Sequence, residues 1–220
     1  MSTILDVYKE RYPVLKERWP KTISVVNGKP ELVDYCPQSR LRDFPLRERQ
    51  SLLDSVGRMF MPEIKKLSTD GAVARDEIKL GFAAGLTGSG KTAFLQELPL
   101  ALPNTPTLQK IRLFHNAPAF VVVLDFNGGG DKFDKMRDGV DGRKNLAMRI
   151  RCNGLHGLSY NELSSVDFEA LSNHPRAVAK ALTDVIAKLR SLATPQISES
   201  EWITLYVLVD EWQVRCSMLL

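Results

Sequence analysis

The stretch GLTGSGKT, residues 85–92, decides which fold to expect. It fits the pattern G-x-x-x-x-G-K-[ST] in full, and the short apolar run EIKLGFAAG leads directly into it. Glycines allow positive φ angles and let backbone amides approach an anion closely. A helix that starts just after them adds the positive end of its dipole. The stretch therefore predicts a strand, a phosphate-binding loop and a helix in that order.

Each residue type in this loop has a chemical reason to be there. The Lys91 ammonium would reach the β- and γ-phosphates of a nucleotide, and the Thr92 hydroxyl would ligate Mg²⁺. The backbone around them would surround the phosphates. The candidate nucleotide-binding residues are Gly85, Gly88, Ser89, Gly90, Lys91, Thr92 and Ala93. The alternative interpretation is a glycine-rich turn followed by a lysine on a solvated helix.

A second motif, LYVLVDE at residues 205–211, is an apolar strand that closes with two acids. The carboxyl end of a parallel strand faces the crevice in which α/β proteins bind ligands. Asp210 would hold Mg²⁺ through water, and Glu211 would polarise a water for attack on the γ-phosphate. The alternative is an acidic strand end that starts a surface helix.

Together the two motifs resemble the P-loop NTPase superfamily, and the consecutive Asp-Glu resembles its additional-strand, catalytic-glutamate division, which includes AAA+ and STAND proteins. VVVLDFNGGGD and VLVDEWQ are also similar to the NTPase region of retrotransposon hot spot proteins and Crinkler-type effectors. The resemblance implies binding of ATP and Mg²⁺ and hydrolysis of the β–γ phosphate bond. It also implies that Lys91 and Glu211 are catalytic residues and that Thr92 and Asp210 are metal ligands.

Hydrophobic periodicity and turn residues predict the remaining elements. A strand and an Asn27-Gly28 turn are expected in TISVVNGK, and a loop in the proline-rich LPLALPNTPTLQ. Buried strands are expected at 119–126 and 202–211. Helices are expected at residues 4–19 with an interruption at Pro13, 46–67 with a kink at Pro62, 91–98 ending before Pro99, and 173–192 with Asn173 as cap and Pro175 in the first turn.

This alternation predicts an α/β fold, a parallel P-loop NTPase sheet with flanking helices. We expect a mostly helical N-terminal segment over residues 1–75 and the NTPase core over 76–220. Only nine residues follow Glu211 in the 220-residue chain, whereas such a domain usually continues for two more strands. We therefore expect an incomplete core, a fragment that binds nucleotide weakly and turns over slowly on its own.

Composition places few further limits on function. The chain is 44% hydrophobic with a net charge of +4, and its N-terminus is charged where a signal peptide would be apolar. We expect an intracellular protein, cytoplasmic or nuclear, with no membrane partner. The charge allows nucleic-acid contact without requiring it, and a protein partner or self-association also stays open. Cys36, Cys152 and Cys216 have no paired spacing, which argues against disulfides and zinc.

Several weaker signals have two interpretations each. Asp125 and Asn127 follow a predicted strand and could border the site, but a glycine turn closed by their side chains is favoured. A basic run could touch nucleic acid or a neighbouring subunit's nucleotide, but a solvated basic face is favoured. Its members are Arg143, Lys144, Arg149 and Arg151. The alternatives for the whole chain are a small-molecule or nucleotide kinase and a non-catalytic nucleotide-binding scaffold.

Overall fold

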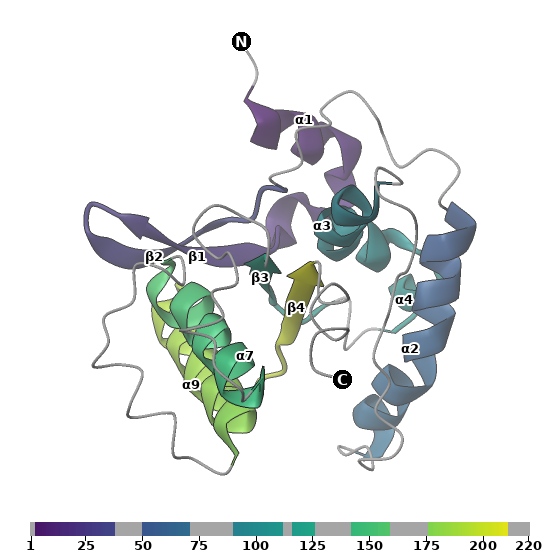
Figure 1. Cartoon of the computed structure of the whole chain (residues 1–220). Coiled ribbons are helices and arrows are strands. Elements are labelled where there is room, and N and C mark those ends of the chain that lie inside the picture. Colours follow the sequence, from purple (N-terminus) through teal and green to yellow (C-terminus); the bar gives the residue numbers. More distant parts are fainter. Residues whose placement is uncertain are drawn as a thin grey trace. The chain divides into compact units, whose positions relative to one another are not determined.

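Figure 1 shows a computed structural model of the chain. It divides into two compact units, each of which is described by itself. The first unit comprises Met1–Pro20, Cys36–Ala119 and Trp202–Thr204, and the second comprises Lys21–Tyr35, Phe120–Glu201 and Leu205–Leu220. The structure describes residues 3–37, 50–70, 90–111, 116–125, 142–158 and 176–210.

The N-terminal helix α1, Ile4–Arg11, begins with a complete capping box. The Thr3 hydroxyl accepts from the Asp6 amide, and the Asp6 carboxylate accepts from the Thr3 amide at 2.7 Å. This exchange satisfies two backbone donors that the first turn of a helix leaves open. A 3₁₀ helix, Pro13–Arg18, follows, so the predicted interruption at Pro13 is confirmed.

Helix α2, Gln50–Asp70, continues through Pro62 as one helix. The predicted helix at 46–67 is confirmed over its described part, and residues 46–49 lie outside the described ranges. Leu53 of α2 forms an apolar cluster with Phe94 and Ala101. This cluster packs α2 against the helix that follows the glycine-rich loop.

That helix, α3, spans Lys91–Ala101, so the predicted end before Pro99 is wrong. The missing amide of Pro99 weakens the helix, but Pro99, Leu100 and Ala101 are all buried, and tertiary packing offsets the loss. The prediction that a loop follows this helix is also wrong. A 3₁₀ turn, Leu102–Asn104, and helix α4, Pro106–Gln109, occupy it. Their prolines lie in first turns, where the proline nitrogen is not needed as a donor.

The second unit contains a β-hairpin that begins the sheet. Strands β1, Lys21–Val26, and β2, Lys29–Asp34, pair antiparallel in the register Val26↔Lys29 to Lys21↔Asp34. Asn27 and Gly28 have φ angles of 52° and 76°, as a two-residue turn between twisted strands requires. The predicted strand and turn are confirmed, and β2 is an additional strand.

Strands β3, Ala119–Asp125, and β4, Thr204–Asp210, complete a four-stranded sheet in the order β2-β1-β3-β4. β1 and β3 are parallel through Lys21↔Phe120. The Thr204 amide donates to the Pro118 carbonyl at 2.8 Å, so β3 and β4 begin side by side. Both predicted strands are confirmed, and the sheet is mostly parallel with flanking helices, an α/β arrangement.

The expectation that β4 is fully buried is wrong. Leu208 is buried, whereas the other six residues of β4 are half-buried. By contrast, Phe120, Val121, Val122 and Leu124 of β3 are all buried. Among the described strands β4 lies at one end of the sheet, with a single neighbour, which accounts for the difference.

Helices α7, Gly142–Arg151, and α9, Ala177–Leu192, pack side by side (Figure 1). A π-helical turn, Cys152–His156, continues α7 and contacts both α9 and β1. The buried stripe of α9 recurs every fourth residue. It consists of Ala177, Ala181, Val185 and Leu189.

Hydrophobic periodicity predicts an apolar face on this helix made of Val178, Leu182, Val185, Ile186 and Leu189. Val185 and Leu189 are buried as expected, whereas Val178, Leu182 and Ile186 are half-buried. Small alanines let α9 approach its neighbours closely, so they occupy the central line of contact. The N-cap of α9 is Arg176, which makes no side-chain capping bond. The predicted cap Asn173 and first-turn Pro175 lie outside the described residues.

Candidate functional site

The described part of the glycine-rich loop is its C-terminal end, where α3 begins. Gly90 is the N-cap of α3, and Lys91 is its first residue. The Phe94 amide donates to the Gly90 carbonyl at 3.0 Å, which closes the first helical turn. The predicted helix start directly after the glycines is therefore confirmed. Thr92 is exposed, while Lys91 and Ala93 are half-buried.

Gly90 has a left-handed backbone, with φ 75° and ψ 27°. L-residues with a side chain rarely adopt this conformation, so glycine is the natural residue here. A glycine also has no side-chain oxygen with which to cap the first turn. The first turn of α3 contains no acidic residue. The positive end of α3 thus meets no carboxylate from its own first turn, an arrangement that suits an anion.

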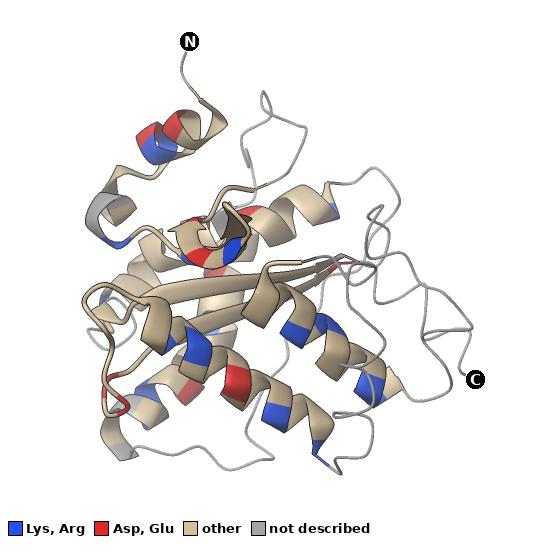
Figure 2. Cartoon of the chain, turned by 90° about the vertical axis from the view of Figure 1, so that its left-hand side faces the viewer, with Lys and Arg blue, Asp and Glu red and all other residues tan. Residues whose placement is uncertain are grey.

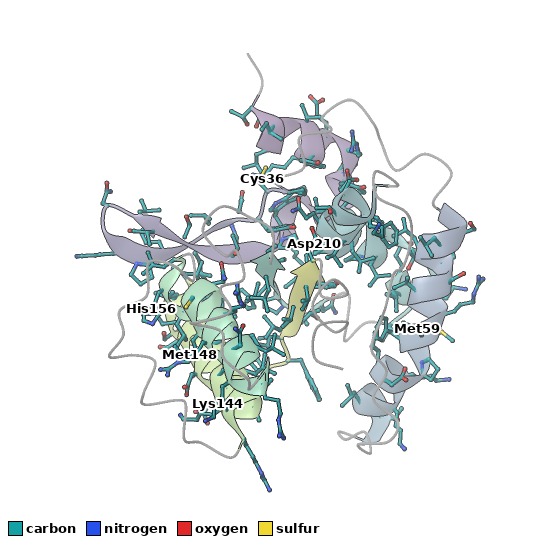
Figure 3. The ribbon with its side chains drawn as sticks, in the orientation of Figure 1. Cys36, Met59, Lys144, Met148, His156 and Asp210 are labelled. Atoms are coloured by element: carbon teal, nitrogen blue, oxygen red, sulfur yellow. The ribbon has the colours of Figure 1, made fainter. Side chains whose placement is uncertain are left out.

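The acid of the second motif lies at the end of a strand. Asp210 is the last residue of β4 and is half-buried, and Figure 3 labels it at the tip of that strand. Asp125 is the last residue of the neighbouring β3. Because the two strands begin side by side and run in the same direction, both end at the same edge of the sheet. This edge is where parallel sheets bind ligands.

The structure places the two motifs in different units. Gly90, Lys91, Thr92 and Ala93 belong to the first, and Asp210 belongs to the second. Their convergence on one magnesium–phosphate group therefore stays a prediction. The remaining candidate residues lie outside the described ranges, together with the strand predicted before the loop. These residues are Gly85, Gly88, Ser89, Asn127 and Glu211.

A buried carboxylate on α3 was missed at the sequence level. Glu97 is 1% exposed, and three side chains from the N-terminal segment donate to it. The Tyr12 hydroxyl donates to Oε2 at 2.9 Å, the Arg11 guanidinium to Oε1 at 3.3 Å, and the Tyr8 hydroxyl to Oε1 at 3.5 Å. A buried charge needs such partners. The available signal was one acid inside the apolar stretch FLQELPLA, and tyrosines four residues apart beside an arginine.

The Glu97 cluster shifts the titration of its tyrosines. Burial, and then the Glu97 charge, raise the pKa of Tyr8 to about 12. Burial also raises the pKa of Tyr12, again with the Glu97 charge as the second cause. In both cases the neutral phenol is favoured because the phenolate would be desolvated and would face a carboxylate.

Tyr8→Phe should reduce the loss of stability at alkaline pH. The folded-state pKa of Tyr8 lies above its ordinary value of 10.0, so the neutral phenol stabilises the folded protein. This contribution is complete below pH 10 and disappears as pH rises to about 12. Between these two pH values, the free energy of unfolding of the wild type, measured with denaturant, should fall by about 1–2 kcal/mol more than that of Tyr8→Phe. Equal pH slopes for the two proteins would show that Tyr8 does not carry the effect.

Lysines and arginines lie along α7 and α9, as Figure 2 shows. Arg151 and Lys180 both pair with Asp184, at 3.9 and 2.6 Å. The expectation of a fully solvated basic face on α7 is wrong for Arg149, which is 1% exposed and donates to the Asn145 side chain at 2.7 Å. Arg149 follows the buried Asn145 by four residues, so both lie on the same inward face of the helix, whereas Arg143 is exposed.

Within the described ranges, no group of three or more His, Cys, Asp and Glu side chains is placed to hold a metal ion. In the same part of the chain, no helix has both the length and the apolar character to span a bilayer.

Comparison with known proteins gives no relative. No family model, no curated protein and no solved structure matches this chain.

Proposed function

We propose that this protein binds a nucleoside triphosphate, ATP in the first instance, with Mg²⁺, and hydrolyses its β–γ phosphate bond. The observation that carries the proposal is the start of α3, where a left-handed Gly90 leads directly into Lys91 and Thr92. A helix that begins directly after a left-handed glycine supports the proposal, because the pattern G-x-x-x-x-G-K-[ST] would direct the amide groups of such a helix start at phosphate. The finer fold assignment, a P-loop NTPase sheet, is part of the same proposal.

The residues take the roles that phosphoryl-transfer chemistry needs. Lys91 would neutralise charge on the β- and γ-phosphates, and Thr92 would bind Mg²⁺ directly. Asp210, at the carboxyl end of β4, would hold the same ion through water. Glu211 follows it in the sequence and would orient the attacking water. Thr92 is exposed, which is compatible with a ligand at this position.

Calorimetric titration of the full chain with MgATP tests the binding step. We expect saturable binding of one nucleotide, and a marked loss of affinity when EDTA removes the Mg²⁺. Titration with MgGTP belongs in the same experiment, because no residue in either motif distinguishes adenine from guanine. Absence of saturation at millimolar MgATP and MgGTP would overturn the proposal.

Glu211→Gln distinguishes hydrolysis from phosphoryl transfer to another molecule. If Glu211 orients water, the variant should retain MgATP affinity while its phosphate release falls about 100-fold or more, because general-base catalysis contributes 10²–10⁴ in rate. A Glu211→Gln protein with unchanged phosphate release would contradict the role of Glu211. A kinase on the same fold would keep most of its transfer activity in this variant.

A further inference from the structure

We propose that Glu97 is a positioning residue through which the N-terminal helix α1 holds the phosphate-binding end of α3 in place. The inference rests on the proposed function and extends it to residues outside both motifs. Glu97 lies on the same helix as Lys91, roughly 9 Å further along its axis at 1.5 Å per residue. It touches neither nucleotide nor metal in this proposal and acts through the helix.

The donors to Glu97 come from one short segment. Tyr8 and Arg11 belong to α1, and Tyr12 is the C-cap of that helix. Tyr8 is buried, and the Arg11 side chain is 23% exposed. The carboxylate therefore exchanges almost all of its water for these three groups. Moving α1 away from α3 would leave a buried charge without its partners, which is costly in free energy.

Hydrogen bonds to a charge fix direction in a way that apolar packing does not. Phe94 and Ala101 also anchor α3, through an apolar cluster with Leu53. Apolar contact depends mainly on buried area and tolerates small rotations of a helix about its axis. The bonds to Glu97 depend on distance and angle, and so they set the rotation of α3. In a helix of eleven residues, that rotation also sets the direction of Lys91 and Thr92.

Glu97→Gln tests this role, because it keeps the shape of the side chain and removes its charge. We expect MgATP affinity to fall about five- to tenfold, within the range that coupling between distant positions usually spans. Tyr12→Phe removes one hydroxyl and should lower affinity about two- to threefold. If Glu97→Gln folds poorly, the affinity of Tyr12→Phe still tests the positioning role. Glu10→Gln, at an exposed position of α1, should leave affinity unchanged.

A destabilised variant of the second unit separates positioning from general loss of stability. Leu189→Ala removes a buried side chain of α9 without altering α1 or α3. Compared at temperatures where every variant is folded, Leu189→Ala should bind MgATP as the wild type does, and Glu97→Gln should not. If Glu97→Gln binds MgATP as tightly as the wild type, the positioning role is wrong while the proposed function stands.

Hydrogen exchange of the free protein provides a readout that needs no nucleotide. Amides of Lys91–Ala101 should exchange about tenfold faster in Glu97→Gln than in Leu189→Ala, since opening of this helix should become less costly. Unchanged exchange in α3 would overturn the inference. If the wild type binds no nucleotide, the proposed function fails, and this experiment still decides whether Glu97 fixes α3.

Discussion

Lys91→Ala should lower the affinity for MgATP at least about 100-fold, which corresponds to about 2.7 kcal/mol of binding free energy. The expected effect is large because the ammonium would make charge-assisted hydrogen bonds to two phosphates, and such bonds are about twice as strong as neutral ones. Lys91 is the first residue of α3, where the helix itself already favours an anion. Removing the lysine should leave the helix intact, because alanine is a good helix former.

The matched control is Lys110→Ala, which removes an exposed lysine from the same unit just after α4. It changes the net charge by the same amount as Lys91→Ala, so any general effect of charge on nucleotide binding appears in both. In calorimetric titrations, the MgATP affinities of the two variants should differ by the same factor of at least about 100. If both variants bind as tightly as the wild type, Lys91 is an ordinary solvated lysine and the glycine-rich stretch is a simple turn.

Gly157→Ala should lower the free energy of unfolding by about 3 kcal/mol, from the sum of backbone strain and overpacking. Gly157 ends the π-helical turn with a φ of 62°, a region that alanine adopts only with strain. A Cβ atom at this position would also lie 2.9 Å from the Ser24 Cα, a backbone atom of β1. Because the clash is with backbone, no side-chain rotation can relieve it.

Gly28→Ala isolates the first of these costs, the backbone strain. Gly28 has a similar φ of 76°, but a Cβ atom there would meet nothing within 4 Å. We therefore expect a loss of only about 1 kcal/mol, from strain alone. Denaturant unfolding, monitored by circular dichroism, measures both variants under the same conditions. Equal losses would mean that β1 can move away from Gly157, and that this contact contributes little to the fold.

Local patterns predicted those elements that local physics determines. The Asn27-Gly28 turn follows from two residues that accept positive φ, and β3 follows from its continuous β-branched run. The start of α3 follows from Gly90 and Lys91 in the same way. In each case the residues that carry the signal adjoin the structure that they cause.

Errors arose where distant packing outweighs local preference. Pro99 should end a helix, yet burial of Leu100 and Ala101 carries α3 past it. Arg149 was expected in solvent and is buried. No local pattern in the sequence predicts the cluster at Glu97, because its donors lie more than eighty residues away in the sequence. The sequence does place Asp125 and Asp210 at the ends of two predicted strands, whereas the fact that these strands are neighbours depends on the strand order, which periodicity does not reveal.

The pairing of Lys21 with Phe120 has a consequence for synthesis on the ribosome. The hairpin β1–β2 can close early, because its two strands are neighbours in the sequence. Its parallel partner β3 emerges only after α2, α3 and α4 have been made. Until then the backbone donors and acceptors along one edge of β1 are unpaired, so β1 can pair with strands of other chains and aggregate during translation. Expression at lower temperature or with a chaperone should therefore improve the yield of monomeric protein.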